Sequence, residues 1–159
     1  MQVSRVYSGA QIALHWMIAL LIGANYLISE GMGDALDARL EGGATQGFTP
    51  NFHVWAGSAV LVLALIRLGM RLGRGAPEAA GEGLLHRAAG MMHWALYALM
   101  IAVPALGAIT WFGGIDATGD LHVLAMNALM ALVLVHAAAA LFHHYFLKDG
   151  LMTRMLRAG

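Results

Sequence analysis

Four long apolar runs, almost free of charged residues, constrain this chain more than any other feature of its sequence. The 159 residues are 60% hydrophobic and only 11% charged, whereas a soluble domain carries about 25% charged residues. A helix needs about 20 residues to cross ~30 Å of hydrocarbon. We therefore predict a single-domain, all-α integral membrane protein over residues 1–159, a four-helix bundle with helices at about 9–29, 51–72, 84–112 and 121–146.

The segments between these runs have the composition of turns. Glycine, aspartate and threonine are frequent in 30–50, and 73–83 and 113–120 are also rich in glycine. Pro104 lies inside the third run and is expected to kink it, which membrane helices tolerate. The first run, 11–29, is long enough for a full span, so we expect a membrane helix rather than a cleaved signal.

The distribution of basic residues predicts the orientation. Of nine lysines and arginines, only Arg39 falls in the first or third connection. The other eight flank the opposite ends of the runs: Arg5, Arg67, Arg71, Arg74, Arg87, Lys148, Arg154 and Arg157. Because cytoplasmic loops carry the excess of lysine and arginine, both termini are predicted to be cytoplasmic. The outer connections are acidic instead, with Glu30, Asp34, Asp37, Glu41, Asp116 and Asp120.

Composition also excludes several chemistries. The formal net charge is zero, which argues against nucleic acid as a partner. The chain has no cysteine, which excludes cysteine-ligated iron–sulfur clusters, disulfides and covalently attached c-type haem. Eight histidines in so apolar a chain are the feature that needs a chemical explanation.

Two histidines of the fourth run have a spacing that suits stacked ligand sites. His122 and His136 are 14 positions apart, which corresponds to about 21 Å of helical rise and nearly four full turns. Both side chains therefore point to one side of the bundle, at two depths. His53 matches the depth of His122 near the outer face, and His15 matches that of His136 near the inner face.

These two depth-matched pairs favour haem ligation. Neutral imidazole is a common axial ligand of haem iron, and helical bundles build cofactor sites from facing side chains. A lone histidine in a membrane helix can instead bond to a backbone carbonyl or lie at the interface. Four histidines in two pairs are harder to explain in that way, because unpaired polar groups are costly in lipid. We predict two haem b groups, held by His15 with His136 and by His53 with His122.

A second polar cluster follows at the inner end of the fourth run. It consists of His143, His144, Tyr145 and Lys148. Such side chains could bind the carbonyl groups of a quinone and relay protons; the alternative is an ordinary interfacial belt of aromatic and basic residues. His93 competes with His15 or His136 as an inner ligand, and His86 lies seven positions before it. Arg67, Arg71 and Arg74 could pair with haem propionates or serve only to set topology.

Five segments resemble the bacterial cytochrome b561 family. They are QIALHW around His15, NFHVWAG around His53, IRLGMRL, YALMIAVPALG and the stretch HAAAALFHHYFLKDG from His136. The resemblance extends in order over nearly the whole chain. It implies a multi-pass protein of the bacterial inner membrane with two b haems near opposite faces, ligated by the same two histidine pairs, and it places His143 near a bound ubiquinone. In one member of the family, superoxide donates an electron at the outer face and ubiquinone accepts it at the inner face.

The chain departs from that member in its outer connections. The third connection is much shorter, and the outer loops carry six acids against Arg39. A positive funnel would speed capture of the superoxide anion, whereas an acidic rim favours a basic periplasmic redox protein. The expected function is electron transfer between one of these outer partners and ubiquinone. The alternatives are a haem-bearing membrane anchor of a larger dehydrogenase or hydrogenase and, more remotely, a histidine-lined transporter for a transition metal.

Overall fold

The computed structural model describes residues 7–45, 47–75 and 83–157, without the side chains of Arg74 and Leu85. Arg5 and most of the second connection therefore lie outside the described residues. Within the described ranges all regular secondary structure is helical, as predicted. Its elements are α1 Gly9–Leu27, α2 Met32–Leu40, α3 Phe48–Arg74, α4 Gly83–Gly113, α5 Ala117–Phe142, the π-helix η1 His143–Leu147 and the 3₁₀-helix η2 Met152–Met155.

Four of these helices are long and apolar enough to cross a membrane. The candidate spans are Gly9–Leu27, Phe48–Gly73, His86–Gly113 and Ala117–Leu147. No more than 22% of any of the four apolar windows is buried inside the protein. Large side chains such as Leu27 and Trp55, which are 80% and 72% exposed, therefore point outward. An apolar surface of this extent is stable in contact with lipid rather than water.

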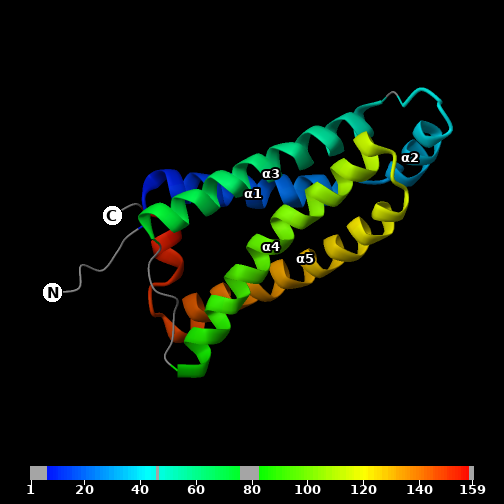
Figure 1. Ribbon diagram of the computed structural model, residues 1–159. Coiled ribbons are helices and arrows are strands. Elements are labelled where there is room, and N and C mark those ends of the chain that lie inside the picture. The colour runs from blue at the N-terminus through cyan, green and yellow to red at the C-terminus, as the bar shows by residue number, and fades with distance from the viewer. Residues whose placement is uncertain (1–6, 46, 76–82, 158–159) are drawn as a thin grey trace.

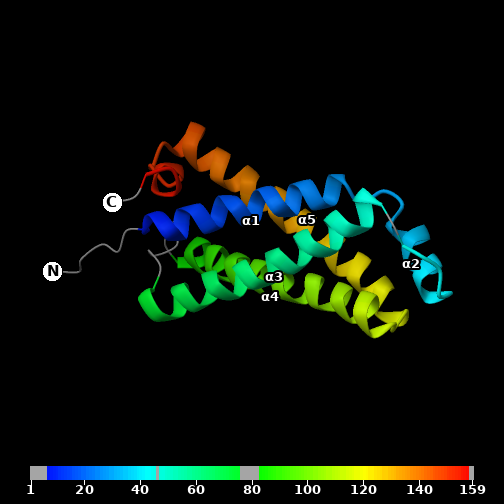
Figure 2. The same cartoon turned by 90° about the horizontal axis from the view of Figure 1, so that it is seen from above.

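The four long helices extend between the same two ends of the bundle without being parallel, and α1 begins at the end where η2 lies (Figure 1). The short helix α2 lies at the opposite end, which we call the outer end. In the view from above, α1 and α3 again lie side by side (Figure 2). The closest helix pairs are α1 with α3, α3 with α4, and α4 with α5. Helix α5 therefore packs mainly against α4 and stands further from α1 and α3.

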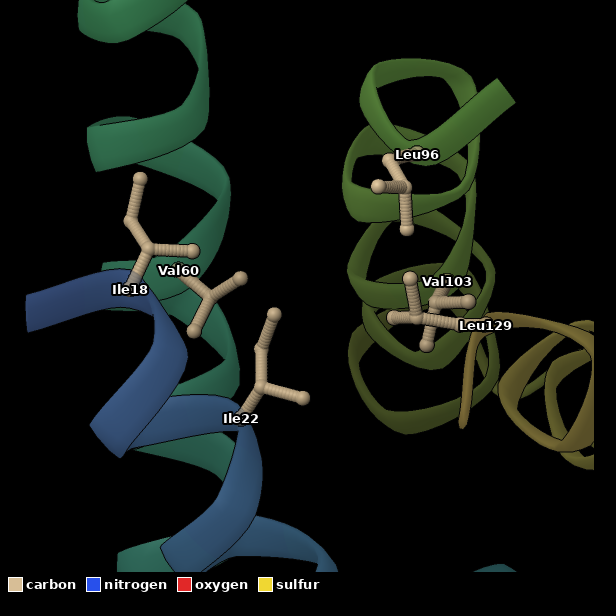
Figure 3. Packing of buried hydrophobic residues seen from close by; sticks show 6 residues of the cluster. All are labelled: Ile18, Ile22, Val60, Leu96, Val103 and Leu129. Atoms are coloured by element: carbon tan, nitrogen blue, oxygen red, sulfur yellow. The ribbon is translucent and has the colours of Figure 1, made fainter. Parts of the chain in front are cut away.

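Buried aliphatic side chains hold these helix pairs together. Ile18 and Ile22 of α1 lie beside Val60 of α3, while Leu96 and Val103 of α4 lie near Leu129 of α5 (Figure 3). Leu129 is only 2% exposed. The close-up shows the side chains of α1 and α3 apart from those of α4 and α5.

Local sequence explains where the first span begins and how the third continues. Ser8 caps α1: its hydroxyl accepts from the backbone N–H of Gln11, and the Gln11 side chain accepts from the N–H of Ser8. This reciprocal arrangement satisfies two donors that a helix start otherwise leaves free. Pro104 lies inside α4, which continues without a break to Gly113.

Two predictions from the sequence need correction. The first connection was expected to contain only turns, but Met32–Leu40 forms α2, which starts after Gly31 at φ 81°. The fourth run was expected to stay α-helical to 146, but its last turn, His143–Leu147, is a π-helix. A π-turn widens the helix and alters the direction of the residues that follow.

Candidate functional site

The outer pair of histidines comes from α3 and α5. The ring centroids of His53 and His122 are 6.0 Å apart, with an angle of 72° between the ring planes. His122 Nδ1 lies 2.8 Å from the carbonyl oxygen of Val103 on α4. Since a carbonyl can only accept, Nδ1 carries the hydrogen and Nε2 keeps a free lone pair. Hydrogen bonds of this kind orient metal-ligating histidines.

A cavity of about 580 Å³ opens beside this pair. Its volume is typical of a cofactor or ligand site, roughly 300–1,000 Å³. All five α-helices contribute to its walls, and it extends inward to the core residues Ile22, Val60, Val103 and Leu129. The cavity thus occupies the space between the α1–α3 pair and the α4–α5 pair.

Gly107 lets the backbone of α4 approach the outer pair closely. A Cβ atom at this position would stand 3.0 Å from His122 Nδ1 and 3.1 Å from its Cε1. Any side chain would therefore press on the imidazole that Val103 orients. Sequence reasoning did not single out this glycine, although a glycine within a helix, three residues after Pro104, was a visible signal.

Within the described ranges, two buried polar atoms at the outer pair have no hydrogen-bond partner. They are His53 Nδ1 and Asn25 Oδ1. The other side-chain atom of this amide, Asn25 Nδ2, donates to the His53 carbonyl oxygen at 3.3 Å. An unsatisfied buried polar atom costs about 1–3 kcal/mol. Unpaired groups on the wall of a large cavity are consistent with a site that binds a group of its own.

The inner pair comes from α1 and α5. The ring centroids of His15 and His136 are 6.4 Å apart, again at 72°. His93 of α4 also reaches this site, with its ring centroid 5.4 Å from that of His136. Its Nδ1 lies 2.8 Å from the Ala89 carbonyl oxygen, so its Nε2 is the free nitrogen. Three imidazoles, from α1, α4 and α5, therefore lie at the inner level. His93 lies where the sequence predicted a competing inner ligand.

The separation within each pair fits an iron atom between the rings. A metal–imidazole bond is about 2 Å long, so two imidazoles on opposite sides of one metal have centroids roughly 6 Å apart. Both pairs also join helices, α3 with α5 and α1 with α5, that are not among the closely packed helix pairs. The outer pair also borders the cavity of about 580 Å³, which gives room for a flat macrocycle at that level. In the described ranges, no three His, Asp or Glu side chains are arranged to hold a bare metal ion.

Two arginines of α3, Arg67 and Arg71, contact neighbouring helices at the inner end. Arg67 Nη1 donates to the Gln11 carbonyl oxygen of α1. The Arg71 guanidinium carbon lies 5.7 Å from the ring centroid of Trp94 and 5.8 Å from that of Tyr97. Burial raises the pKa of Tyr7 beside them, although both arginine charges oppose this shift. These two cations thus lie near the inner histidines, where propionates were expected, but they also join α1, α3 and α4.

The four residues expected to bind quinone lie at the inner end of α5, in η1 and the turn after it. His143 Nδ1 lies 2.5 Å from Asp149 Oδ2. The rings of His144 and Tyr145 form an edge-to-face pair with centroids 4.8 Å apart. Lys148 has φ 51°, the only positive φ of a non-glycine residue in the described ranges. Asp149 was not among the residues singled out from the sequence, because its approach depends on this turn.

Four apolar helices around two facing pairs of imidazoles define a membrane cytochrome. The profile of the prokaryotic cytochrome b561 family matches residues 6–158, and this chain belongs to that family. The resemblance found in the sequence is thereby confirmed. Membership implies haem b and a role in electron transport.

Three relatives cover nearly the whole chain. Cytochrome b562 of Cereibacter sphaeroides is 46% identical over 151 residues, covering 95% of both chains. The probable superoxide oxidase CybB of Yersinia pestis is 31% identical over 180 aligned positions, covering 94% of this chain and 95% of its own. Cytochrome b561 homolog 1 of Escherichia coli K12 is 29% identical over 173 aligned positions, covering 94% and 96%. No solved structure matches the chain significantly.

Proposed function

We propose that this protein is a dihaem cytochrome b of the bacterial inner membrane that transfers electrons between a donor at its outer face and ubiquinone at its inner face. His53 and His122 hold the outer haem, and His15 and His136 hold the inner one. The proposal rests on two pairs of facing imidazoles, whose ring centroids are 6.0 Å apart in the outer pair and 6.4 Å apart in the inner pair. One continuous helix, α5, contributes a histidine to each pair. Both termini lie on the cytoplasmic side.

When bound, the haems supply the one-electron redox chemistry. The chain supplies ligation, spacing and an apolar surrounding. Val103 fixes the tautomer of His122 by accepting from its Nδ1. The 14 residues from His122 to His136 separate the two sites by about 21 Å along α5. His143, His144, Tyr145 and Lys148 surround the quinone next to the inner site.

The charged residues around the outer cavity determine which donor can bind there. Asp37, Asp116 and Asp120 line the outer cavity. The one basic residue of the outer connections, Arg39, already donates from Nε to the Trp111 carbonyl oxygen at 2.8 Å and stacks over that ring. An acidic rim attracts a cationic soluble redox protein and repels an anion such as superoxide. We therefore favour a basic periplasmic carrier, although one relative carries the name of a probable superoxide oxidase.

Haem stoichiometry of purified variants tests the ligand assignment. The wild type should contain two haems b per chain, and His53→Ala and His15→Ala should each contain one, with different spectra. His93→Ala should retain both haems, because His93 assists the inner site without ligating it. His86→Ala is the matched control outside both pairs. One haem in the wild type, or loss of the inner haem in His93→Ala with retention in His15→Ala, would contradict the assignment.

Anaerobic stopped-flow spectroscopy tests the direction of transfer and the donor. Protein with bound ubiquinone is mixed either with superoxide or with a reduced basic cytochrome c. Fast reduction by the cationic carrier, slowed by salt, is expected from the acidic rim. Fast reduction by superoxide with little response to the carrier would show that the acidic rim does not select the donor.

A further inference from the structure

The end of α5 brings a carboxylate onto a histidine six positions before it. The π-helix His143–Leu147 is followed by Lys148 in the left-handed region, φ 51°. This turn reverses the chain, so that Asp149 Oδ2 meets His143 Nδ1 at 2.5 Å. The second oxygen, Asp149 Oδ1, accepts from the Leu151 N–H at 3.0 Å. Both carboxylate oxygens are thus engaged in fixed directions.

The C-terminal segment is itself held against the first helix. Trp16 Nε1 of α1 donates to the carbonyl oxygen of Met155, the last residue of the short helix η2, at 2.8 Å. The turn that carries Asp149 is therefore anchored on both sides, by α5 and by α1. A contact anchored in this way can keep an imidazole in one orientation.

The side chains of His143 and Asp149 are both partly exposed to solvent. The His143 side chain is 24% exposed and that of Asp149 is 36% exposed. The hydrogen bond from His143 holds the pKa of Asp149 below its usual value of 3.8, with a smaller effect of the Leu151 N–H. The carboxylate is therefore ionised near neutral pH and can only accept. His143 Nδ1 carries the hydrogen, and Nε2 remains for a second partner.

We propose that Asp149 is a positioning residue that holds His143 by its Nδ1 in one orientation, so that His143 delivers protons to ubiquinone from Nε2. This inference rests on the proposed quinone function. Reduction of one ubiquinone to ubiquinol consumes two electrons, which arrive one at a time from the outer donor through the haems, and two protons. Each proton leaves Nε2 for a quinone oxygen, and the ring is reprotonated from cytoplasmic water.

Other charged and titratable groups lie toward the same end of the protein. They are His144, Tyr145 and Lys148 on η1 and the turn, Arg154 on η2, His136 on α5, Tyr7 and His15 on α1, and His86, Arg87 and His93 at the inner end of α4. Among them, Arg154 also lowers the pKa of Asp149 through its charge. Within the described residues, Asp149 is the carboxylate that contacts His143, so Asp149→Asn removes the negative partner of that ring.

The test uses the haem-loaded protein and measures oxidation of pre-reduced haem by a short-chain ubiquinone, between about pH 5.5 and 8.5. In Asp149→Asn, oxidation of the haem should be roughly tenfold slower at the alkaline end of this range. This loss is smaller than the whole contribution of general acid catalysis, which is about 10²- to 10⁴-fold. The rate should approach that of the wild type at the acidic end, because protons from the medium are then more available to the quinone. KM for the quinone should stay within about twofold, and Asp149→Glu should recover most of the rate. Arg157→Gln, which removes an exposed charge at the same end of the protein, is the control.

Each result separates this inference from the proposed function. Wild-type rates and pH profile in Asp149→Asn would overturn the role of Asp149 and leave quinone reduction standing. A uniform loss at every pH, without rescue by Asp149→Glu, would also overturn it, because that pattern indicates a purely structural contact. Failure of ubiquinone to oxidise the reduced wild type would instead overturn the proposed function. Two haems per chain in Asp149→Asn show that the variant is folded.

Discussion

Gly107 is the residue at which a single methyl group would meet the outer histidine pair. In Gly107→Ala the new Cβ would lie 3.0 Å from His122 Nδ1, so the ring must turn away from the Val103 carbonyl oxygen. Loss of such an orienting bond weakens metal sites by roughly 10- to 100-fold. We expect the outer haem to dissociate selectively, as measured by haem titration and the reduced-minus-oxidised spectrum.

A matched glycine provides the control for this prediction. A Cβ at Gly23, within α1, would meet nothing within 4 Å. Gly23→Ala should keep both haems and should, if anything, stabilise α1 by about 0.5–1 kcal/mol, because alanine is the better helix former. Unchanged outer-haem affinity in Gly107→Ala would mean that the ring adapts without losing its ligand geometry.

At the scale of single elements, α2 depends on one arginine. Arg39 Nε donates to the Trp111 carbonyl oxygen at 2.8 Å, and the guanidinium carbon lies 4.8 Å from the Trp111 ring centroid. These exposed contacts join α2 to the outer end of α4 and are worth about 1 kcal/mol together. In Arg39→Gln, amide hydrogen exchange should accelerate roughly fivefold in Met32–Leu40. Exchange in α1 should not change in Arg39→Gln, and the control variant Arg157→Gln should change exchange nowhere. An unchanged exchange rate of α2 in Arg39→Gln would show that other contacts hold this helix.

The elements also show what sequence can and cannot predict. The four spans were predictable because crossing a membrane imposes both length and hydropathy on each run. That His122 and His136 lie on one side of α5 at two depths was predictable, because a spacing of 14 residues within a helix fixes both. Helix α2 is short and not strongly apolar, and its place depends on Trp111, 72 positions from Arg39. Such distant contacts leave no local pattern.

The approach of His93 to His136 illustrates the same limit. Depth along the bundle made His93 a competitor, but only the rotation of α4 about its axis determines whether its ring points inward. That rotation follows from packing of residues such as Leu96 and Val103 against the neighbouring helices. The contact of Asp149 with His143 was hidden for a related reason, because it requires a π-turn followed by a left-handed lysine.

At the scale of the whole molecule, charge asymmetry predicts which end faces the cytoplasm. The end at which α1 begins also holds the last turns of α3, with Arg67 and Arg71, and the segment from η1 to η2, with Lys148 and Arg154. Basic residues stay on the cytoplasmic side. The opposite end holds α2 and its acidic neighbours. Electrons from a periplasmic donor would then enter at His53 and His122 and leave toward the cytoplasmic face.

Because the natural chain has no cysteine, single introduced cysteines can report the side of each end without background. Glu41→Cys, just after α2, should react with a membrane-impermeant maleimide in intact spheroplasts. Thr153→Cys, within η2, should react only after the membrane is opened. A third variant, Asp34→Cys in α2, should behave like Glu41→Cys. The reverse pattern would invert the topology, and a basic periplasmic donor could then no longer reach the acidic rim around the His53 and His122 site.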